Sequence, residues 1–244
     1  MRAFAYSMLV LLAACGESRA PQAGPDGAVP GDAASATSPS AVVAASVASS
    51  SAYPPLDGRN GELVNPDDGS MVLLYFDLAG IKAPLEQWVE DDQRIRYGPG
   101  SKKAALRIQV RAELDATAAS VRNVGVIRLS LNTQLSDYDP TYGEYTISGL
   151  APSSVVTFKA LGQEVTLRFG NGRTAQVWAV PKERAQSIDD ALDYGRGVTI
   201  DAVLHISTVQ PAPRGGTIVA NVVEYELRQT RGDRLLARVK VPRS

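Results

Sequence analysis

The pattern of hydrophobic and polar residues along the chain changes its period near Asn123. Before that point apolar residues recur every three or four positions, which is typical of amphipathic helices. After it they alternate with polar residues, which is typical of half-buried strands. The 244-residue sequence therefore predicts helices followed by strands.

Three segments before Asn123 are predicted to be helical. Residues 84–96 start with a proline, and residues 101–123 start with Ser101 as the predicted N-cap. Residues 70–80 form an apolar run that suits either a buried strand or a short buried helix, and the flanking Ser70 and Gly80 favour the helix. The positions expected to face the core are Leu85, Trp88, Val89, Ile95, Leu106, Val110, Leu114, Ala118 and Val121.

Residues 155–169 predict a β-hairpin. With a two-residue turn at Gly162-Gln163, Phe158 lies opposite Leu167. This register sorts the apolar side chains to one face, and a slip of one residue would destroy the sorting.

The C-terminal residues 228–243 carry six bases and one acid and predict one strand of a second hairpin. A three-residue loop centred on Gly232 would give two facing pairs of opposite charge, Glu226 with Arg238 and Glu224 with Lys240. This explains much of the basic ribbon without an anionic ligand. The acid-rich residues 53–100, with nine acids and four bases, are also expected to pair with the ribbon.

Helices followed by hairpin-linked strands indicate an α+β domain. We expect N-terminal helices packed on an antiparallel β-sheet built of hairpins, with one short helix inserted at residues 181–194. Capping-box spacing of Ser187 and Asp190 leaves open a later start for that helix. Further strands are expected at residues 125–135, 174–180 and 197–210.

Composition divides the chain into three parts. Residues 1–14 combine a basic start, an apolar run and small residues, as a signal peptide does. Residues 15–52 contain the only cysteine and a linker of mostly Ala, Ser, Pro and Gly, which buries too little apolar surface to fold. Residues 53–244 have the composition of a single globular domain.

The cysteine directly follows the apolar run, in the sequence Leu12-Ala13-Ala14-Cys15. This motif resembles a bacterial lipobox. The resemblance implies that Cys15 is lipidated and becomes the new N-terminus. The following Gly16 stands where many proteins retained in the inner membrane have Asp, which implies the outer membrane, facing the periplasm. The expected partners are thus the membrane, through the lipid anchor at Cys15, and an envelope protein, with no nucleic acid.

Residues that could carry catalysis are few. His205 is the only histidine and lies within a predicted strand, and no Gly-x-Ser-x-Gly motif is present. The acidic run Glu90, Asp91 and Asp92 could supply the two carboxylates of a glycosidase, but adjacent helix residues point in different directions, so a solvated face is expected. No metal site and no cofactor are expected.

The loop at residues 136–145 is the candidate binding site. Its carboxylates lack the spacing of a calcium loop. Its tyrosines offer amphipathic contact surface for a partner protein, although Asp-Pro and Tyr-Gly also suit an ordinary turn. The candidate contact residues are Tyr138, Tyr142 and Tyr145, and the loop carboxylates are Asp137, Asp139 and Glu144.

The order of predicted elements from Tyr138 to Tyr225 is a Tyr-Asp turn, a hairpin, a Trp-containing strand, a short helix and two long strands. This order is similar to that of bacterial lipoproteins with an uncharacterised domain, a resemblance that implies no activity and no functional residue.

The sequence favours a non-enzymatic, membrane-anchored lipoprotein that binds another envelope component. A periplasmic inhibitor or immunity lipoprotein against a cell-wall-attacking enzyme is the alternative, followed by an enzyme acting on cell-wall glycan. The tether would concentrate an inhibitor where the attack arrives.

Overall fold

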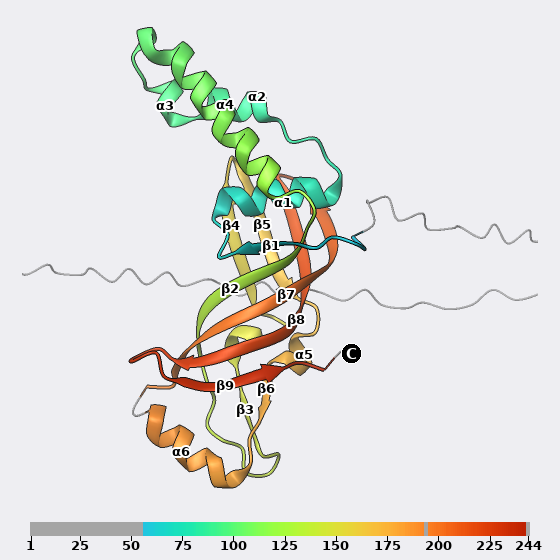
Figure 1. Cartoon of the computed structure of the whole chain (residues 1–244), viewed down its shortest axis with the longest axis vertical. Coiled ribbons are helices and arrows are strands. Elements are labelled where there is room, and N and C mark those ends of the chain that lie inside the picture. The colour runs from blue at the N-terminus through green and yellow to red at the C-terminus, as the bar shows by residue number, and fades with distance from the viewer. Residues whose placement is uncertain (1–55, 193–194, 243–244) are drawn as a thin grey trace, which may run out of the picture. The chain divides into compact units, whose positions relative to one another are not determined.

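A computed structural model describes residues 56–192 and 195–242, which belong to one compact unit (Figure 1). The expected signal peptide, the lipidated Cys15 and the linker lie outside the described residues. The helices are α1 (Asp68–Ala79), α2 (Leu85–Asp91), α3 (Gln93–Arg96), α4 (Lys103–Ser120), α5 (Gly172–Ala175) and α6 (Lys182–Leu192), with single 3₁₀ turns η1 (Gly100–Lys102) and η2 (Ser148–Leu150). The strands are β1 (Gly61–Val64), β2 (Val124–Gln134), β3 (Glu144–Thr146), β4 (Val155–Ala160), β5 (Gln163–Phe169), β6 (Val177–Ala179), β7 (Gly197–Ala212), β8 (Gly215–Gln229) and β9 (Leu235–Lys240).

The predicted α+β class is confirmed, but the sheet is mixed. Within the described residues the main sheet has seven strands in the order β1-β2-β7-β8-β5-β4, with β9 also paired to β8. The β1–β2 and β5–β8 pairs are parallel, which corrects the expectation of a purely antiparallel sheet. Strands β3 and β6 form a separate antiparallel pair. The chain runs from β1 through the helices to β2, and this long connection lets the two strands run in the same direction. Strand β5 adds to β8 on the edge opposite β7.

Helix α1 is buried on nearly all sides. It contacts β4, β5, β7 and β8 on one side and α4 on another, and Phe76 packs edge-on against Trp88 of α2 at 5.2 Å between ring centroids. This environment explains why residues 70–80 carry no one-sided polar pattern, since a helix apolar all round is buried all round. The helix expected there is confirmed, with Gly80 as its C-cap, but Asp67 rather than Ser70 is the N-cap.

The helix expected at residues 84–96 is two helices. The backbone of Asp92 is extended, and its carboxylate accepts a hydrogen bond from the Arg94 N–H at 2.7 Å. An aspartate in this conformation is an N-cap, so it ends α2 and starts α3. The expected core positions are confirmed on both sides of Asp92, since Trp88 and Val89 of α2 and Ile95 of α3 are buried.

Helix α4 and the two short helices form an arm that projects from one end of the sheet (Figure 1). Val89, Ile95 and Val110 form the small core of this arm. Ser101 lies in the η1 turn, and the N-cap of α4 is Lys102 without a side-chain hydrogen bond, which corrects the predicted cap. Among the described residues no helix is long and apolar enough to cross a membrane.

The hairpin of β4 and β5 forms with its register two residues away from the expected one. Phe158 lies opposite Val165 rather than Leu167. The turn is Leu161-Gly162, and both residues have positive φ, 55° and 70°. A two-residue hairpin turn with two positive φ angles matches the strand twist, which explains the choice. A shift by two residues does not change which side chains share a face, so the predicted separation of apolar from polar side chains still holds.

Strands β8 and β9 pair as predicted at Glu226 opposite Arg238 and Glu224 opposite Lys240. The first pair is an ion pair at 2.7 Å. The predicted three-residue loop is wrong, because the register shifts between Leu227 and Arg228 and the Gln229 N–H donates to the Arg234 carbonyl oxygen, which makes the loop residues 230–233. The expected pairing of residues 53–100 with the basic ribbon is wrong for the ion pairs described. The acids of that segment pair instead with Arg59, Arg94, Arg96, Arg107, Arg111 and Arg128.

The inserted helix α6 starts at Lys182, so the later start near Ser187 is wrong. Its inward residues Ala185, Ile188 and Leu192 are buried as expected.

Truncation of Leu74 in α1 is expected to lower the free energy of unfolding strongly. Leu74 is fully buried, so Leu74→Ala removes packing on every side and should cost about 2 to 5 kcal/mol. The matched control is Ile108→Ala in α4, where the side chain is 74% exposed and the change should stay within about 0.5 kcal/mol. Urea unfolding of both variants measures the difference, and equal losses would contradict the central position of α1.

Candidate binding groove

Strand β8 is longer than either strand on its outer edge. Its first part, from Gly215 to Ala220, pairs with β5, and its later part, from Glu224 to Arg228, pairs with β9. Residues 221–223 lie in the gap between these two partners. A buried backbone group without a partner is costly, so the fold must fill this gap.

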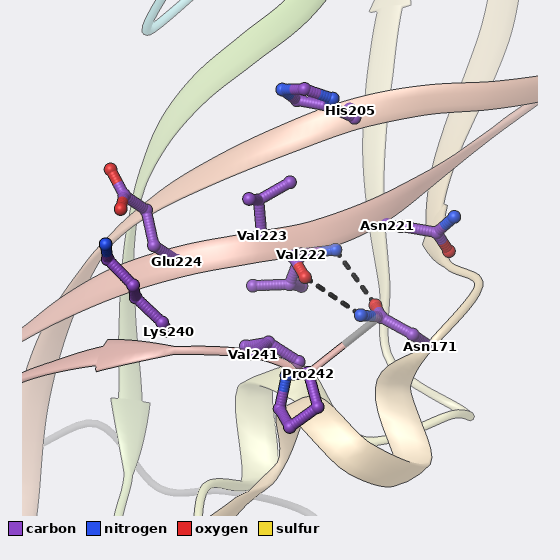
Figure 2. Close-up of a pocket in the computed structure, with 9 residues that line it drawn as sticks. All are labelled: Asn171, His205, Asn221, Val222, Val223, Glu224, Lys240, Val241 and Pro242. Carbon is purple, nitrogen blue, oxygen red and sulfur yellow. Dashed lines mark hydrogen bonds between the residues drawn. The ribbon is translucent and has the colours of Figure 1, made fainter. Parts of the chain in front are cut away.

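The side chain of Asn171 fills the gap. Its Oδ1 accepts a hydrogen bond from the Val222 N–H at 2.9 Å, and its Nδ2 donates to the Val222 carbonyl oxygen at 2.8 Å (Figure 2). The amide group thus pairs with β8 as a strand residue would. Asn171 holds this position because β5 ends at Phe169 and the chain turns into α5.

A hollow of about 650 Å³ lies at the same gap. Figure 2 shows Glu224 and Lys240 together at one end of it and Asn221 at the other, with His205 on the neighbouring β7. His205 lies within strand β7, as predicted, and its side chain is exposed. The register of β7 and β8 shifts beside it, between Val203 and Leu204, which is a β-bulge. No group of three or more His, Cys, Asp or Glu side chains in the described part of the chain could hold a metal ion.

A larger groove, of about 810 Å³, runs beside β9. Every residue from Ala237 to Pro242 lines it, so the groove follows the outer edge of the strand. The opposite wall comes from Thr174 in α5, from β6 and from Arg184 in α6. Half-buried Val177, Ala237 and Val239 supply apolar surface that an occupant would cover.

The β6 wall is held by the tyrosines of the predicted loop. The ring of Tyr145 stacks on Trp178 at 5.4 Å between centroids. Its hydroxyl donates to the Ala185 carbonyl oxygen and bonds to Asp189 of α6, both at 3.1 Å. The hydroxyl of Tyr138 donates to the Val180 carbonyl oxygen at 3.0 Å.

These contacts correct the candidate site at residues 136–145. Tyr145 is fully buried and offers no surface to a partner, because the amphipathic side chain serves the core. Tyr138 is half-buried beside it. Only Tyr142 of the three is widely exposed, at 76%. The tyrosines therefore do not form one exposed cluster.

Two of the three loop carboxylates, Asp137 and Asp139, bond to neighbouring residues, and Glu144 belongs to strand β3. Asp139 accepts hydrogen bonds from the Thr141 and Tyr142 N–H groups, which is an Asx turn. Asp137 pairs with Arg196 at 2.7 Å, and Arg196 also pairs with Asp189. The turn interpretation of this loop accounts for these contacts.

The charge of the groove beside β9 is positive. Arg184, Arg238 and Lys240 line it, and no carboxylate is among its described lining residues. Arg238 also pairs with Glu226 of β8. The pKa of Glu226 is lowered, first by its hydrogen bond to Arg228 and then by the charge of Arg238, so this acid stays ionised.

The acidic run of the arm has arginine partners. Glu90 pairs with Arg107 at 2.6 Å, and a side-chain hydrogen bond from that arginine lowers the pKa of Glu90. Asp92 pairs with Arg94, whose hydrogen bond lowers the pKa of Asp92. Asp91 pairs with Arg96. A glycosidase needs one acid with a raised pKa, so these two shifts run against that chemistry.

Comparison with known proteins gives no match: no family model, no curated protein and no solved structure matches this chain.

Sequence reasoning missed the groove because its walls are far apart in the chain. One signal in the sequence pointed to the groove. The last predicted strand has only its hairpin partner as a predicted neighbour, so its other edge is predicted to be unpaired. Asn171 also carries a signal, since it stands between Gly170 and Gly172 directly after a predicted strand.

Removal of the Asn171 amide is expected to destabilise the domain. Asn171→Ala leaves the N–H and carbonyl of Val222 without partners and should cost about 2 to 3 kcal/mol. The control is Asn221→Ala, in the same hollow but exposed, where the change should be small. Denaturant unfolding measures both, and equal values would contradict the role of Asn171 in closing the gap.

Two buried tyrosines should respond in opposite ways to loss of the hydroxyl. Tyr145→Phe loses two hydrogen bonds and should cost about 1 to 2 kcal/mol. The Tyr225 hydroxyl is buried without a partner in the described structure, so Tyr225→Phe should leave stability unchanged or raise it. Thermal unfolding of the two variants makes the comparison, and a large loss for Tyr225→Phe would show that its hydroxyl is bonded.

Alkaline pH gives a second readout for Tyr225. Burial raises its pKa, so the unfolded chain releases this proton at a lower pH than the folded one. The contribution of protonated Tyr225 to the free energy of unfolding is complete below about pH 10, and it is lost as the pH rises toward the pKa of Tyr225 in the folded protein. Tyr225→Phe should therefore flatten the fall of stability above pH 10.

Proposed function

We propose that the protein is a membrane-anchored lipoprotein of the bacterial cell envelope whose folded domain binds another envelope protein in the groove beside β9. The anchor is the lipidated Cys15, and the membrane is the outer membrane, with the domain facing the periplasm. The domain acts by binding rather than by catalysis.

The groove is the observation that carries the proposal. It combines half-buried apolar side chains with a strand edge that no described strand pairs with, and its described lining residues include no carboxylate and no histidine. Protein interfaces are built from apolar anchors surrounded by polar and charged residues, which matches this composition. Among the described lining residues, Thr174 and Lys240 are the groups that could act as nucleophile or base, and no carboxylate or imidazole stands beside them to complete an acid and base pair.

The anchor is supported by the sequence Leu12-Ala13-Ala14-Cys15 behind an apolar run. Two or more acyl chains hold a protein stably at a membrane, because each buried methylene contributes about 0.8 kcal/mol. Residues 16–52, rich in small and polar residues, would let a tethered domain reach a partner in the same envelope.

Site-specific photocrosslinking in the native envelope tests this proposal. A photoreactive amino acid replaces the exposed Ala179 in the groove wall, and a matched one replaces the exposed Ile108 on the arm. We expect a distinct crosslinked protein from position 179 that is absent from position 108. The same product from both positions, or none from position 179, would contradict binding in the groove.

The anchor is tested in the same strain with Cys15→Ser. Loss of the acyl chains should move the protein from the membrane fraction to the soluble fraction and weaken the crosslink from position 179. A Cys15→Ser variant that stays with the membrane would contradict lipid anchoring.

A further inference from the structure

In the described part of the chain, β9 pairs only with β8, and its outer edge carries backbone groups without a described strand partner. The Val241 N–H donates to the Val223 carbonyl oxygen at 2.8 Å, so the groups of Val241 point toward β8. Backbone groups alternate sides along a strand, so those of Lys240 and Arg238 point away from β8. These are residues that line the groove. An extended segment in the groove can therefore hydrogen-bond to β9 as an added strand.

The two faces of β9 carry different chemistry. Ala237 and Val239 are half-buried and apolar on one face, whereas Arg238 and Lys240 are exposed cations on the other. Side chains of adjacent strands meet those on the same face of their neighbour. A strand added to β9 would therefore place alternate side chains against apolar and against basic residues.

The cations of the groove are only partly neutralised. Among the described residues Lys240 and Arg184 have no ion-pair partner, although Lys240 stands opposite Glu224 in the register. Arg238 shares Glu226 with Arg228. An occupant that supplied carboxylates would thus meet positive charge without displacing strong pairs.

We propose that the groove takes an extended, acidic segment of the partner protein, added as a strand to β9. Acidic side chains of the segment face Arg238 and Lys240, and small or β-branched apolar side chains cover Ala237 and Val239. This inference rests on the proposed function and specifies the chemistry of its partner.

Charged residues on an edge strand can also act only to prevent unwanted pairing. That role and the proposed one differ in a measurable way. Protection alone predicts that no extended peptide binds at β9, whatever its charge. Strand addition predicts binding that depends on both the charge and the backbone of the peptide.

Binding of synthetic peptides to the full-length protein separates these cases. One peptide of about seven residues alternates Val and Glu, and its matched control alternates Val and Lys. In fluorescence polarisation the Glu peptide should bind at least about tenfold more tightly than the Lys peptide. Raising the salt concentration should reduce this difference in affinity. Equal affinities, or no binding of either peptide, would overturn the proposal.

Backbone methylation tests for strand addition itself. N-methyl groups at alternate residues of the Glu peptide block one edge of its strand, and the other alternate set blocks the opposite edge. We expect one set to weaken binding about tenfold and the other to have little effect. Equal effects of the two sets would show that the peptide does not pair with β9.

Chain variants locate the site. Arg184→Glu reverses a charge in the groove, whereas Lys182→Glu reverses an exposed charge on the same helix outside the groove lining. Only Arg184→Glu should weaken binding of the Glu peptide, and equal weakening would indicate general attraction to a basic surface.

The outcomes also separate this inference from the proposed function. A crosslink from position 179 without preference for the Glu peptide would overturn the acidic strand and leave the binding function standing. Absence of that crosslink would remove the proposed function itself.

Discussion

The hydrogen-bonding requirement of strand β8 is the constraint on which the rest of the structure depends. Fourteen of its fifteen residues pair with β7 on one side, with Val223 left over at the bulge, while its outer edge is divided between β5 and β9. Every buried peptide group at that division needs a partner. Asn171 supplies it at Val222, which allows β5 to leave the sheet and β9 to begin. The open edge of β9 and the groove beside it follow from this division.

Both walls of the groove pack against the core. On one side Tyr145, stacked on Trp178 and bonded to α6, fixes the short pair β3–β6. On the other side the β8–β9 register places Tyr225 and Leu227 in the core beneath the edge. A site between preformed walls loses little conformational entropy on binding, so affinity depends mainly on what the occupant supplies.

Much of the fold could be predicted from the sequence, because local patterns decide local structure. The spacing of apolar residues located α4 and α6. A loop centred on Gly232 predicted that Glu226 faces Arg238, which is confirmed although the loop is one residue longer than expected. The β4–β5 register was wrong because two turns satisfy the same alternation, and only the positive φ at Leu161 distinguishes them. The prediction of Tyr145 as a contact residue is wrong because aromatic residues in a loop serve either a core or an interface, and Tyr145 belongs to the core. Nothing local to β9 shows that β6 lies across from its edge.

Amide hydrogen exchange at the edge of β9 tests whether a partner strand pairs with this edge. The measurement compares the N–H groups of Arg238 and Lys240 in the free protein with those in the protein bound to its crosslinked partner. The outward N–H of Thr157, on the far edge strand β4, is the reference, since Lys159 two residues later bonds to Asp68 rather than to β5. If the partner pairs with β9, its binding slows exchange of the Arg238 and Lys240 N–H groups and leaves the exchange rate of the Thr157 N–H unchanged. Unchanged exchange at β9, with the partner bound, would show that the edge is not where the partner is held.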